Sequence, residues 1–497
     1  MPSKPTTRWQ VSGYRFLVRR MEHALVRRDV RMLHDPMRSQ TRAYAVGLVL
    51  ACVVLAGCGI LALLRPQDKI GSNTLLIGKE SGGVYVVIDG VVHPALNLAS
   101  ARLAADDAGK AVIVKESELS KKPRGQLIGI PGAPAALRYD KDGKGRAWSV
   151  CDVLKVDGSG DMTTTIIAGD PELGDKASAM PGDKALLVTV NDQAYLVYDQ
   201  QRARVDMTDR KVTDALGITG RTPRPVSEGL INAIPEVLPI IPPKINDPGA
   251  SVSYQIGGHR VGDVVQVSTE PDQDYVVLQE GLQPVSRLTA DIIRNTYRLS
   301  PGDTKIDQTD KVAAQVADSL AVSTYPRVQP TVVDVEDQPV SCMSWKPIPA
   351  ADRSTDGGKR AELSVLTGVT LPIPDNAKPV SLAKADGSGP NADTVYVPPG
   401  TGAFVQTTGI EEDSQRKDSM FYVADTGVRY GIKNAAAQKA LGLDAEAGVT
   451  PEPAPWPIVG LLANGPTLGR EEAMVAHDGV APDPSPAPKP VGNQNSN

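Results

Sequence analysis

Few residues in this chain have the types and the spacing that chemistry requires. The stretch Gly78–Ser81 (GKES) is similar to the end of a phosphate-binding loop, but that pattern needs a glycine five residues before Gly78, where the chain has Asn73. The stretch also leads into the strand-like run YVVID, whereas a phosphate loop leads into a helix. The sequence therefore does not favour a nucleotide site here.

The other candidate motifs fail in the same way. The run DKDG at 140–143 is similar to the start of a calcium loop, but its glycine comes two positions early and its twelfth position is Cys151 instead of Glu, so it predicts a polar hairpin turn. The sequence contains no GxSxG, HExxH or CxxC, and its five histidines are widely separated. Scattered carboxylates leave open a hydrolase site formed only by the fold. We predict no catalytic residue, no metal site and no cofactor.

The first structural element that the sequence predicts clearly is an uncharged run of 22 residues, Ala43–Leu64. As a helix it would be about 33 Å long, enough to cross a membrane. Residues 1–42 carry a net charge of +7 and the rest of the chain carries −12. By the positive-inside rule we expect a single-pass inner (plasma) membrane protein with a cytoplasmic N-terminus and an extracytoplasmic main part. The acidic main part argues against nucleic-acid binding.

The apolar run contains a second possible signal. Leu55-Ala56-Gly57-Cys58 has the form of a lipoprotein cleavage box, and cleavage there would make Cys58 a lipidated N-terminus. The basic segment before the run is longer than that of a signal peptide, and apolar residues continue to Leu64. We therefore expect an uncleaved anchor.

The four cysteines form two pairs. Cys52 and Cys58 lie inside the apolar run, whereas Cys151 and Cys342 lie beyond it, on the side where disulfides persist. We expect a Cys151–Cys342 disulfide that closes a loop of about 190 residues. The alternative is two buried thiols.

The basic segment before the anchor is expected to be a helix from about Ser12, a capping residue, to His34. Its apolar residues follow helical spacing and its arginines occupy the other faces. It could lie on anionic lipid or dock against the cytoplasmic part of another membrane protein. The residues proposed for docking are Tyr14, Phe16, Leu17, Arg19, Arg20, Met21, Arg27 and Arg28.

Four later segments resemble one another, because each reads as a β-hairpin followed by a helix. An apolar segment marked by Gly or Pro follows in three of them, and the third copy lacks a clean equivalent. Their uneven spacing argues against a propeller or a solenoid. The four segments are Tyr85–Leu103, Tyr195–Leu216, Tyr275–Ile293 and Tyr422–Leu441.

Strand-like stretches between these segments carry the two outer cysteines, at 148–156 and 339–347, and another lies at 362–373. We infer an α+β fold in which four small α/β repeats surround a central β domain. The expected divisions are a cytoplasmic basic helical segment (1–42), a transmembrane helix (43–64), repeat 1 (75–135), the central β domain (146–190 and 330–375), repeat 2 (191–245), repeat 3 (255–325), repeat 4 with a C-terminal segment (378–478), and a disordered tail (479–497).

The chain resembles the EccB family, a core membrane component of mycobacterial type VII (ESX) secretion systems. The resemblance covers essentially the whole length. Its most specific parts are residues 7–36, HPALNLASARL (93–103), LIGIPGAP (127–134), VCD (150–152), SCMSW (341–345) and LLANGPTLGREEAMVAHD (461–478).

The resemblance implies an elongated extracytoplasmic part, a Cys151–Cys342 disulfide and association of several copies through the outer domains. The implied partners are EccC, the motor ATPase, EccD, EccE and the mycosin protease MycP. Some descriptions of the family attach ATP hydrolysis to it, but this sequence has no Walker motif, so we assign the energy source to EccC. We predict a structural and assembly subunit of the channel, with an ATPase or hydrolase subunit and a cell-wall-binding module as the alternatives.

Overall fold

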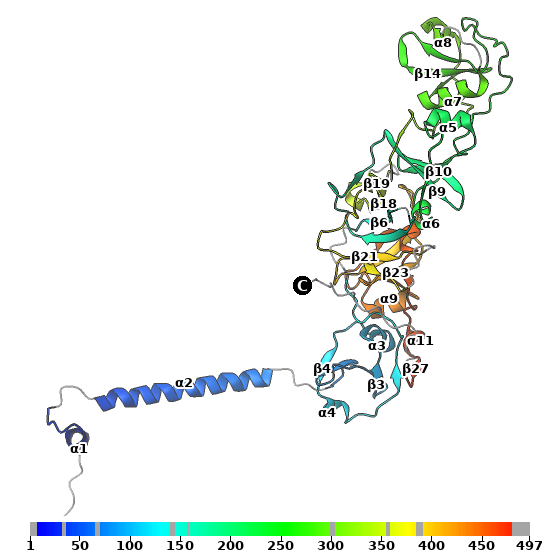
Figure 1. The fold of residues 1–497 in the computed structure, drawn as a ribbon. Coiled ribbons are helices and arrows are strands. Elements are labelled where there is room, and N and C mark those ends of the chain that lie inside the picture. The colour runs from blue at the N-terminus through cyan, green and yellow to red at the C-terminus, as the bar shows by residue number, and fades with distance from the viewer. Residues whose placement is uncertain are drawn as a thin grey trace, which may run out of the picture. The chain divides into compact units, whose positions relative to one another are not determined.

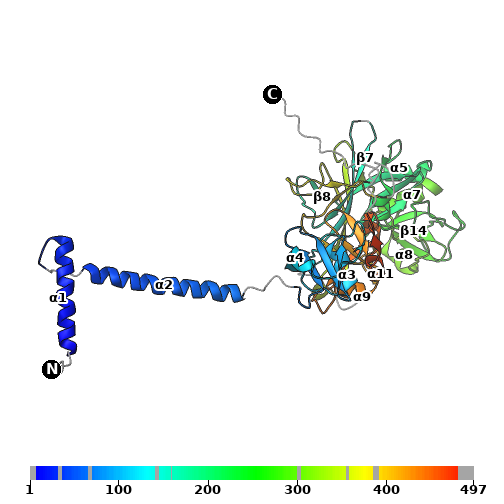
Figure 2. The same ribbon diagram turned by 90° about the horizontal axis from the view of Figure 1, so that it is seen from below.

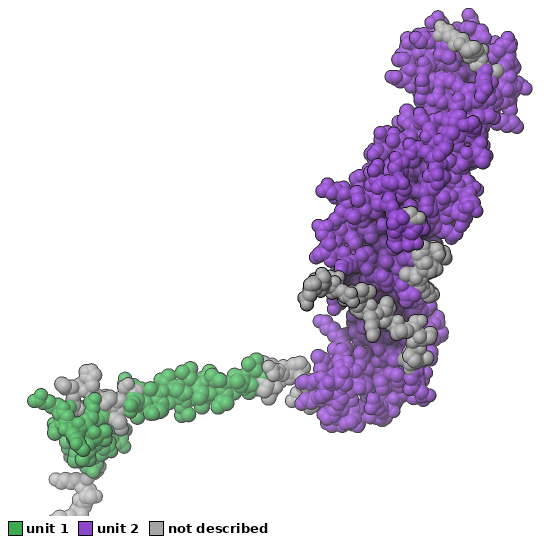
Figure 3. All heavy atoms as spheres, in the orientation of Figure 1, with its two compact units in different colours: residues 1–69 green, residues 70–497 purple. Residues whose placement is uncertain are grey.

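The computed structural model describes residues 7–31, 36–64, 70–139, 145–157, 159–298, 304–353, 358–383 and 391–479. The expected polar turn at 140–143, the helix end at His34 and most of the expected tail lie outside these residues. The chain divides into two compact units, residues 1–69 and 70–497, which are described separately (Figure 3).

The first unit consists of two helices, α1 (Arg8–Arg27) and α2 (Pro36–Leu64), drawn in blue in Figure 1 and Figure 2. Helix α1 begins four residues before the expected start, where the Thr7 N–H donates to Gln10 Oε1 at 3.0 Å. It ends at Arg27, well before the expected end, because Arg28 adopts the left-handed conformation (φ 54°). Within α2, residues Gln40–Leu61 are long and apolar enough to cross a membrane.

The second unit contains a seven-stranded sheet built from two separated parts of the chain. Its order is β20-β21-β7-β6-β18-β19-β8, and β18 pairs antiparallel with both β6 and β19. Almost every residue of β6 and β18 is buried, as expected for central strands that are covered on both faces. The strands are β6 (Trp148–Leu154), β7 (Met162–Ala168), β8 (Ala177–Ala179), β18 (Val340–Pro347), β19 (Ala361–Gly368), β20 (Val380–Ser381) and β21 (Thr394–Tyr396).

Four hairpins, each followed by a helix, lie where the sequence predicts them. An Asn, Asp or Ser caps each helix, and its side chain accepts a hydrogen bond from a backbone N–H of the first turn. They are β2 (Val84–Ile88), β3 (Val91–Ala95) and α3 (Leu98–Ala105); β10 (Gln193–Tyr198), β11 (Gln201–Arg204) and α5 (Arg210–Leu216); β14 (Glu270–Leu278), β15 (Gly281–Val285) and α7 (Arg287–Tyr297); and β23 (Met420–Val423), β24 (Val428–Gly431) and α9 (Ala435–Leu441).

Each hairpin is extended in the same order. A strand that precedes the hairpin pairs antiparallel with the first strand of the hairpin. A further strand, which follows the helix, pairs parallel with this preceding strand. A short helix follows. These elements are β1 (Leu75–Gly78), β4 (Val112–Val114) and α4 (Glu116–Leu119); β9 (Lys184–Val190), β12 (Arg224–Pro225) and α6 (Glu228–Asn232); β13 (Val264–Val267), β16 (Lys305–Ile306) and α8 (Gln308–Ala313); and β22 (Ala403–Thr408), β25 (Glu452–Pro455) and α10 (Trp456–Val459).

A return segment then runs parallel to the last hairpin strand. In the first and fourth sheets it contains β5 (Leu127–Ile128) and β26 (Ala463–Asn464), and in the second it forms bridges at Glu236 and Ile240. The third sheet has one too, since Leu282 bridges Val316. The return that the sequence did not reveal in the third copy is therefore present.

Two further pairings differ from the expected divisions. Strand β9 belongs to the second hairpin's sheet instead of the central sheet, where the division at 190 had put it. Strand β27 (Ala476–His477) pairs with β5, so the C-terminal segment joins the first sheet. Three small elements complete the fold: β17 (Thr331–Val332), a 3₁₀ turn at Ala350–Asp352, and α11 (Arg470–Ala473).

Candidate functional site

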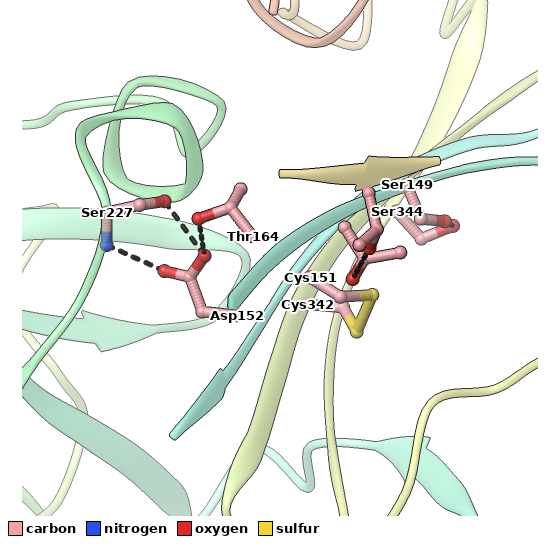
Figure 4. Close-up of a disulfide and its surroundings, with 9 residues drawn as sticks. Ser149, Cys151, Asp152, Thr164, Ser227, Cys342 and Ser344 are labelled. Carbon is pink, nitrogen blue, oxygen red and sulfur yellow. Dashed lines mark hydrogen bonds between the residues drawn. A yellow bond between two sulfur atoms is a disulfide. The ribbon is translucent and has the colours of Figure 1, made fainter. Parts of the chain in front are cut away.

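The two outer cysteines meet at the middle of the central sheet. Cys151 on β6 lies directly opposite Cys342 on β18, and the two form a disulfide across 191 positions of sequence (Figure 4). Both are buried, in a cluster that includes Ile167 and Leu366. The expected disulfide is therefore present, and the alternative of two buried thiols does not hold.

The residue after Cys151 makes a buried polar junction. Asp152 accepts hydrogen bonds from the Thr164 hydroxyl (2.9 Å), the Ser227 backbone N–H (2.7 Å) and the Ser227 hydroxyl (2.8 Å), as Figure 4 shows. Ser227 also caps α6, because its side chain accepts from the Leu230 N–H. The carboxylate thus attaches the second sheet's short helix to the central sheet.

Burial sets the electrostatics of this junction. It raises the pKa of Asp152 to about 6, and the hydrogen bonds from Ser227 and Thr164 and the charge of Arg224 offset only part of that rise. Burial also lowers the pKa of Arg224, which donates to the carbonyls of Gln338 and Pro339 at 3.1 and 3.0 Å. The junction holds segments together and gives Asp152 a titration near neutral pH.

The Gly78–Ser81 loop, which is similar to a phosphate loop, donates its backbone N–H groups to acceptors within the protein. The backbone N–H groups of Glu80 and Ser81 donate to the Glu116 carboxylate at 3.1 and 3.0 Å. Those of Gly78 and Lys79 donate to the carbonyls of Gly83 and Val114. A side-chain carboxylate from α4 therefore occupies the donors that a phosphate would use.

Two of the histidines contact backbone carbonyls of the first sheet's return segment. His93 Nδ1 lies 3.1 Å from the Gln126 carbonyl and His477 Nε2 lies 2.8 Å from the Gly129 carbonyl. In the described part of the chain, no three His, Cys, Asp or Glu side chains are placed to hold a metal ion.

The eight proposed docking residues do not share one face. At about 100° per residue, Tyr14, Leu17 and Met21 of α1 lie on one stripe. Arg19 lies on the opposite side, Phe16, Arg20 and Arg27 lie between the stripe and that side, and Arg28 lies beyond the helix end. Helix α1 has no buried residue, and Tyr14, Leu17 and Met21 are 70%, 56% and 62% exposed. It presents an apolar stripe and an arginine face that no described element covers.

Comparison with known proteins decides the family. The family model described as "Type VII secretion system ESX-1, transport TM domain B" matches residues 3–482. The chain belongs to the EccB family. It is 39% identical to ESX-3 secretion system ATPase EccB3 of Mycolicibacterium smegmatis, over 97% of this chain and 92% of that protein. It is 36% identical to ESX-1 secretion system ATPase EccB1 of Mycobacterium tuberculosis, over 98% of both.

Solved structures of EccB proteins share the fold. A chain of an intact ESX-5 inner membrane complex matches with a TM-score of 0.73 and 32% identity, over 99% of each chain. An EccB3 dimer from the ESX-3 core complex matches with a TM-score of 0.69 and 34% identity, over 81% of this chain and all of that one. EccB proteins are thus components of ESX inner membrane complexes and associate with one another.

Two functional features escaped the sequence analysis. Asp152 adjoins a cysteine that was singled out, but its partner Ser227 lies 75 positions away. The only local signal was a Ser before an apolar stretch, which is typical of a helix cap. The second feature, a basic cavity, is described below.

Proposed function

We propose that this EccB chain is a structural and assembly subunit of the inner-membrane channel complex of a type VII secretion system. The observation that carries the proposal is the match, over 99% of both chains, to a subunit of an intact ESX-5 inner membrane complex. In this role, α2 anchors the subunit and the disulfide-bonded second unit provides a scaffold for assembly. The four similar sheets are copies of one structural unit, and the second unit associates with another copy.

The topology is part of this proposal. Helix α1 lies in the cytoplasm and residues 70–497 lie outside it, because positive charge is retained on the cytoplasmic side. The charge of +7 before the anchor and −12 from there on supports this orientation. The disulfide supports it too, since disulfides persist outside the reducing cytoplasm.

In this proposal the subunit binds partners on both sides of the membrane. The arginine face of α1 docks the cytoplasmic parts of EccC, EccD and EccE, and the second unit meets MycP and further EccB copies. The absence of any buried residue in α1 supports docking, because a basic amphipathic helix of this kind is stabilised by a partner or a lipid surface.

The docking role is tested by reversing the charges of Arg19, Arg20, Arg27 and Arg28 to Glu in one variant. Complex recovered from mild detergent extracts should fall several-fold, while the circular dichroism of the purified chain stays unchanged. The matched control reverses four exposed cations of the second unit, Lys110, Lys115, Lys122 and Arg124. Unchanged recovery with the arginine variant would refute docking and leave lipid attraction as the role of α1.

An ATPase is the second candidate, because the related EccB1 and EccB3 proteins carry that word in their names. The purified full-length chain should then hydrolyse ATP at a rate that Lys79→Ala abolishes. We expect no such hydrolysis, because the Gly78–Ser81 loop donates its backbone N–H groups within the protein. Hydrolysis that survives removal of contaminating motor proteins would favour the enzyme.

A further inference from the structure

A cavity of about 410 Å³ lies between the central sheet and the fourth hairpin sheet. The central sheet contributes the end of β18 and the segment before β19, and the fourth sheet contributes β22, the loop after it and the approach to β25. Its volume is that of a small-molecule site. The lining residues are Trp345, Arg353, Arg360, Gln406, Thr408, Ser414, Gln415, Arg416, Lys417, Pro451 and Pro453.

The described residues of the lining carry four positive charges and no carboxylate. Within the described residues, no Asp or Glu lies at ion-pair distance from Arg353, Arg360, Arg416 or Lys417. The Glu412 carboxylate pairs with a different cation, Lys359, at 2.6 Å. Four cations around one cavity repel one another, and a bound anion would relieve that repulsion.

Neutral donors accompany the cations. The Trp345 side chain, which is only 2% exposed, forms part of the cavity floor. The Thr408 hydroxyl donates to Ser414 Oγ at 3.2 Å, which leaves the Ser414 hydroxyl proton for a ligand.

The cavity walls are held in place by the backbone. The Arg360 and Ala361 N–H groups both donate to the Glu412 carbonyl, at 2.6 and 3.0 Å, and join the two sheets beside the cavity. Arg353 is oriented by its Nε, which donates to the Ile348 carbonyl at 2.9 Å. Its terminal nitrogens remain for a second partner.

We propose that this cavity binds a small ligand through its phosphate groups. Arginine presents paired donors that match phosphate oxygens, and three arginines with a lysine suit two adjacent phosphates better than one. Pro451 and Pro453 add an apolar wall against which the rest of a ligand could pack. A ligand in this position would bridge the central and fourth sheets.

The test is calorimetric titration of the full-length chain in nonionic detergent, at 150 mM salt, with inorganic pyrophosphate. We expect saturable binding with one site per chain. Arg353→Gln with Arg360→Gln should weaken it at least tenfold, and so should Arg416→Gln with Lys417→Gln. The second pair lies on an exposed loop, so its result does not depend on how the first variant folds. The matched control, Lys122→Gln with Arg124→Gln, should leave binding unchanged.

Three results would overturn the proposal: no saturable binding up to millimolar pyrophosphate, equal weakening by the control pair, or citrate binding as tightly as pyrophosphate. Magnesium-free ATP distinguishes the sources of phosphate. If ATP binds with the same affinity as pyrophosphate, the site recognises the phosphates alone. If ATP binds tenfold more tightly and adenosine weakens its binding by competition, the ligand is a nucleotide.

Discussion

Two adjacent residues of β6 act on different parts of the second unit. Cys151 is bonded to β18, the neighbouring central strand, and Asp152 is hydrogen-bonded to the start of α6 in the second hairpin sheet. Because side chains alternate along a strand, the two point to opposite faces of the sheet. These two residues thus link β6 to β18 within the central sheet and link the central sheet to α6.

Removing the disulfide should destabilise the central sheet. The chain-entropy model gives a loss of about 5 kcal/mol for Cys151→Ala with Cys342→Ala, because the closed loop is long. Trp148 and Trp345 face each other across the same strand pair, so their fluorescence should report the transition in guanidinium. The control is Cys52→Ala with Cys58→Ala, which changes the two free cysteines. Equal midpoints for the two double variants would contradict the expectation.

Asp152 should make stability depend on pH. Its folded pKa of about 6 lies above the unfolded value of 3.8, so the folded state holds the proton more tightly. Its contribution to stability is greatest below pH 3.8 and is lost as the pH rises toward and through 6. The free energy of unfolding of the wild type, minus that of Asp152→Asn, should therefore fall by about 2–3 kcal/mol between pH 4 and pH 7.

Denaturant titrations at several pH values measure that difference. Asp318→Asn, which removes one negative charge at an exposed position, is the control for the change of charge. A flat difference for Asp152→Asn would show that the burial of this carboxylate does not control its titration.

At the scale of elements, the hairpins were predictable and their additional strands were not. The hairpins show period-two apolar patterns around turns such as Asp89-Gly90, where φ is 50° and 81°. The added strands β12 and β16 have only two residues each, too few for any periodicity, and pair with strands about 40 positions away. Their places follow from tertiary pairing alone.

The return segment of the third sheet passes so close to residue 281 that only glycine fits there. Its φ is 154°, and a Cβ there would lie 2.1 Å from the Gln315 carbonyl oxygen, which accepts from the Leu282 N–H. Gly281→Ala should separate the return segment from β15 and destabilise the protein by roughly 2–4 kcal/mol.

Hydrogen exchange of residues 281–285 and 315–320 gives the local measurement. Gly90→Ala is the matched control, since Gly90 has a positive φ of 81° but open space around its Cβ position. The control should cost only the backbone strain, about 1 kcal/mol. Similar exchange in both variants would mean that the return segment tolerates displacement.

At the scale of the whole second unit, its last described strand pairs with its first sheet. Strand β27 pairs with β5, and the His477 ring nitrogen lies 2.8 Å from the Gly129 carbonyl. One hydrophobic cluster also joins residues of the first sheet, such as Leu75 and Leu103, with residues of the fourth, such as Tyr430 and Leu441. The first and fourth sheets therefore form one cooperative body.

Deleting residues 474–497 should expose the β5 edge. We expect faster hydrogen exchange at Leu127–Ile130 and faster proteolysis of the first sheet, because an unpaired edge loses its protection. Deleting only 480–497 leaves β27 in place and should change neither. If both deletions behave alike, the pairing contributes nothing to stability.

The sequence indicated the anchor, the basic helix and the disulfide because each depends on local composition or on a count of cysteines. It could not indicate the basic cavity, because Arg353 and Arg416 lie 63 positions apart and acidic residues such as Glu411 and Asp413 are interspersed with the cations. Only the pairing of β18, β22 and β25 with their neighbours brings the cations around one space.

The second and third hairpin sheets are inserted between the two bonded cysteines, since β9 to β16 all fall between positions 151 and 342. A protease that cuts the backbone once anywhere in this insertion would leave both fragments on one covalent molecule. On a denaturing gel such a nicked chain would migrate as a single band until a thiol reductant separated the pieces. The fragment that follows the cut would thus stay covalently attached to the part of the chain that carries α2.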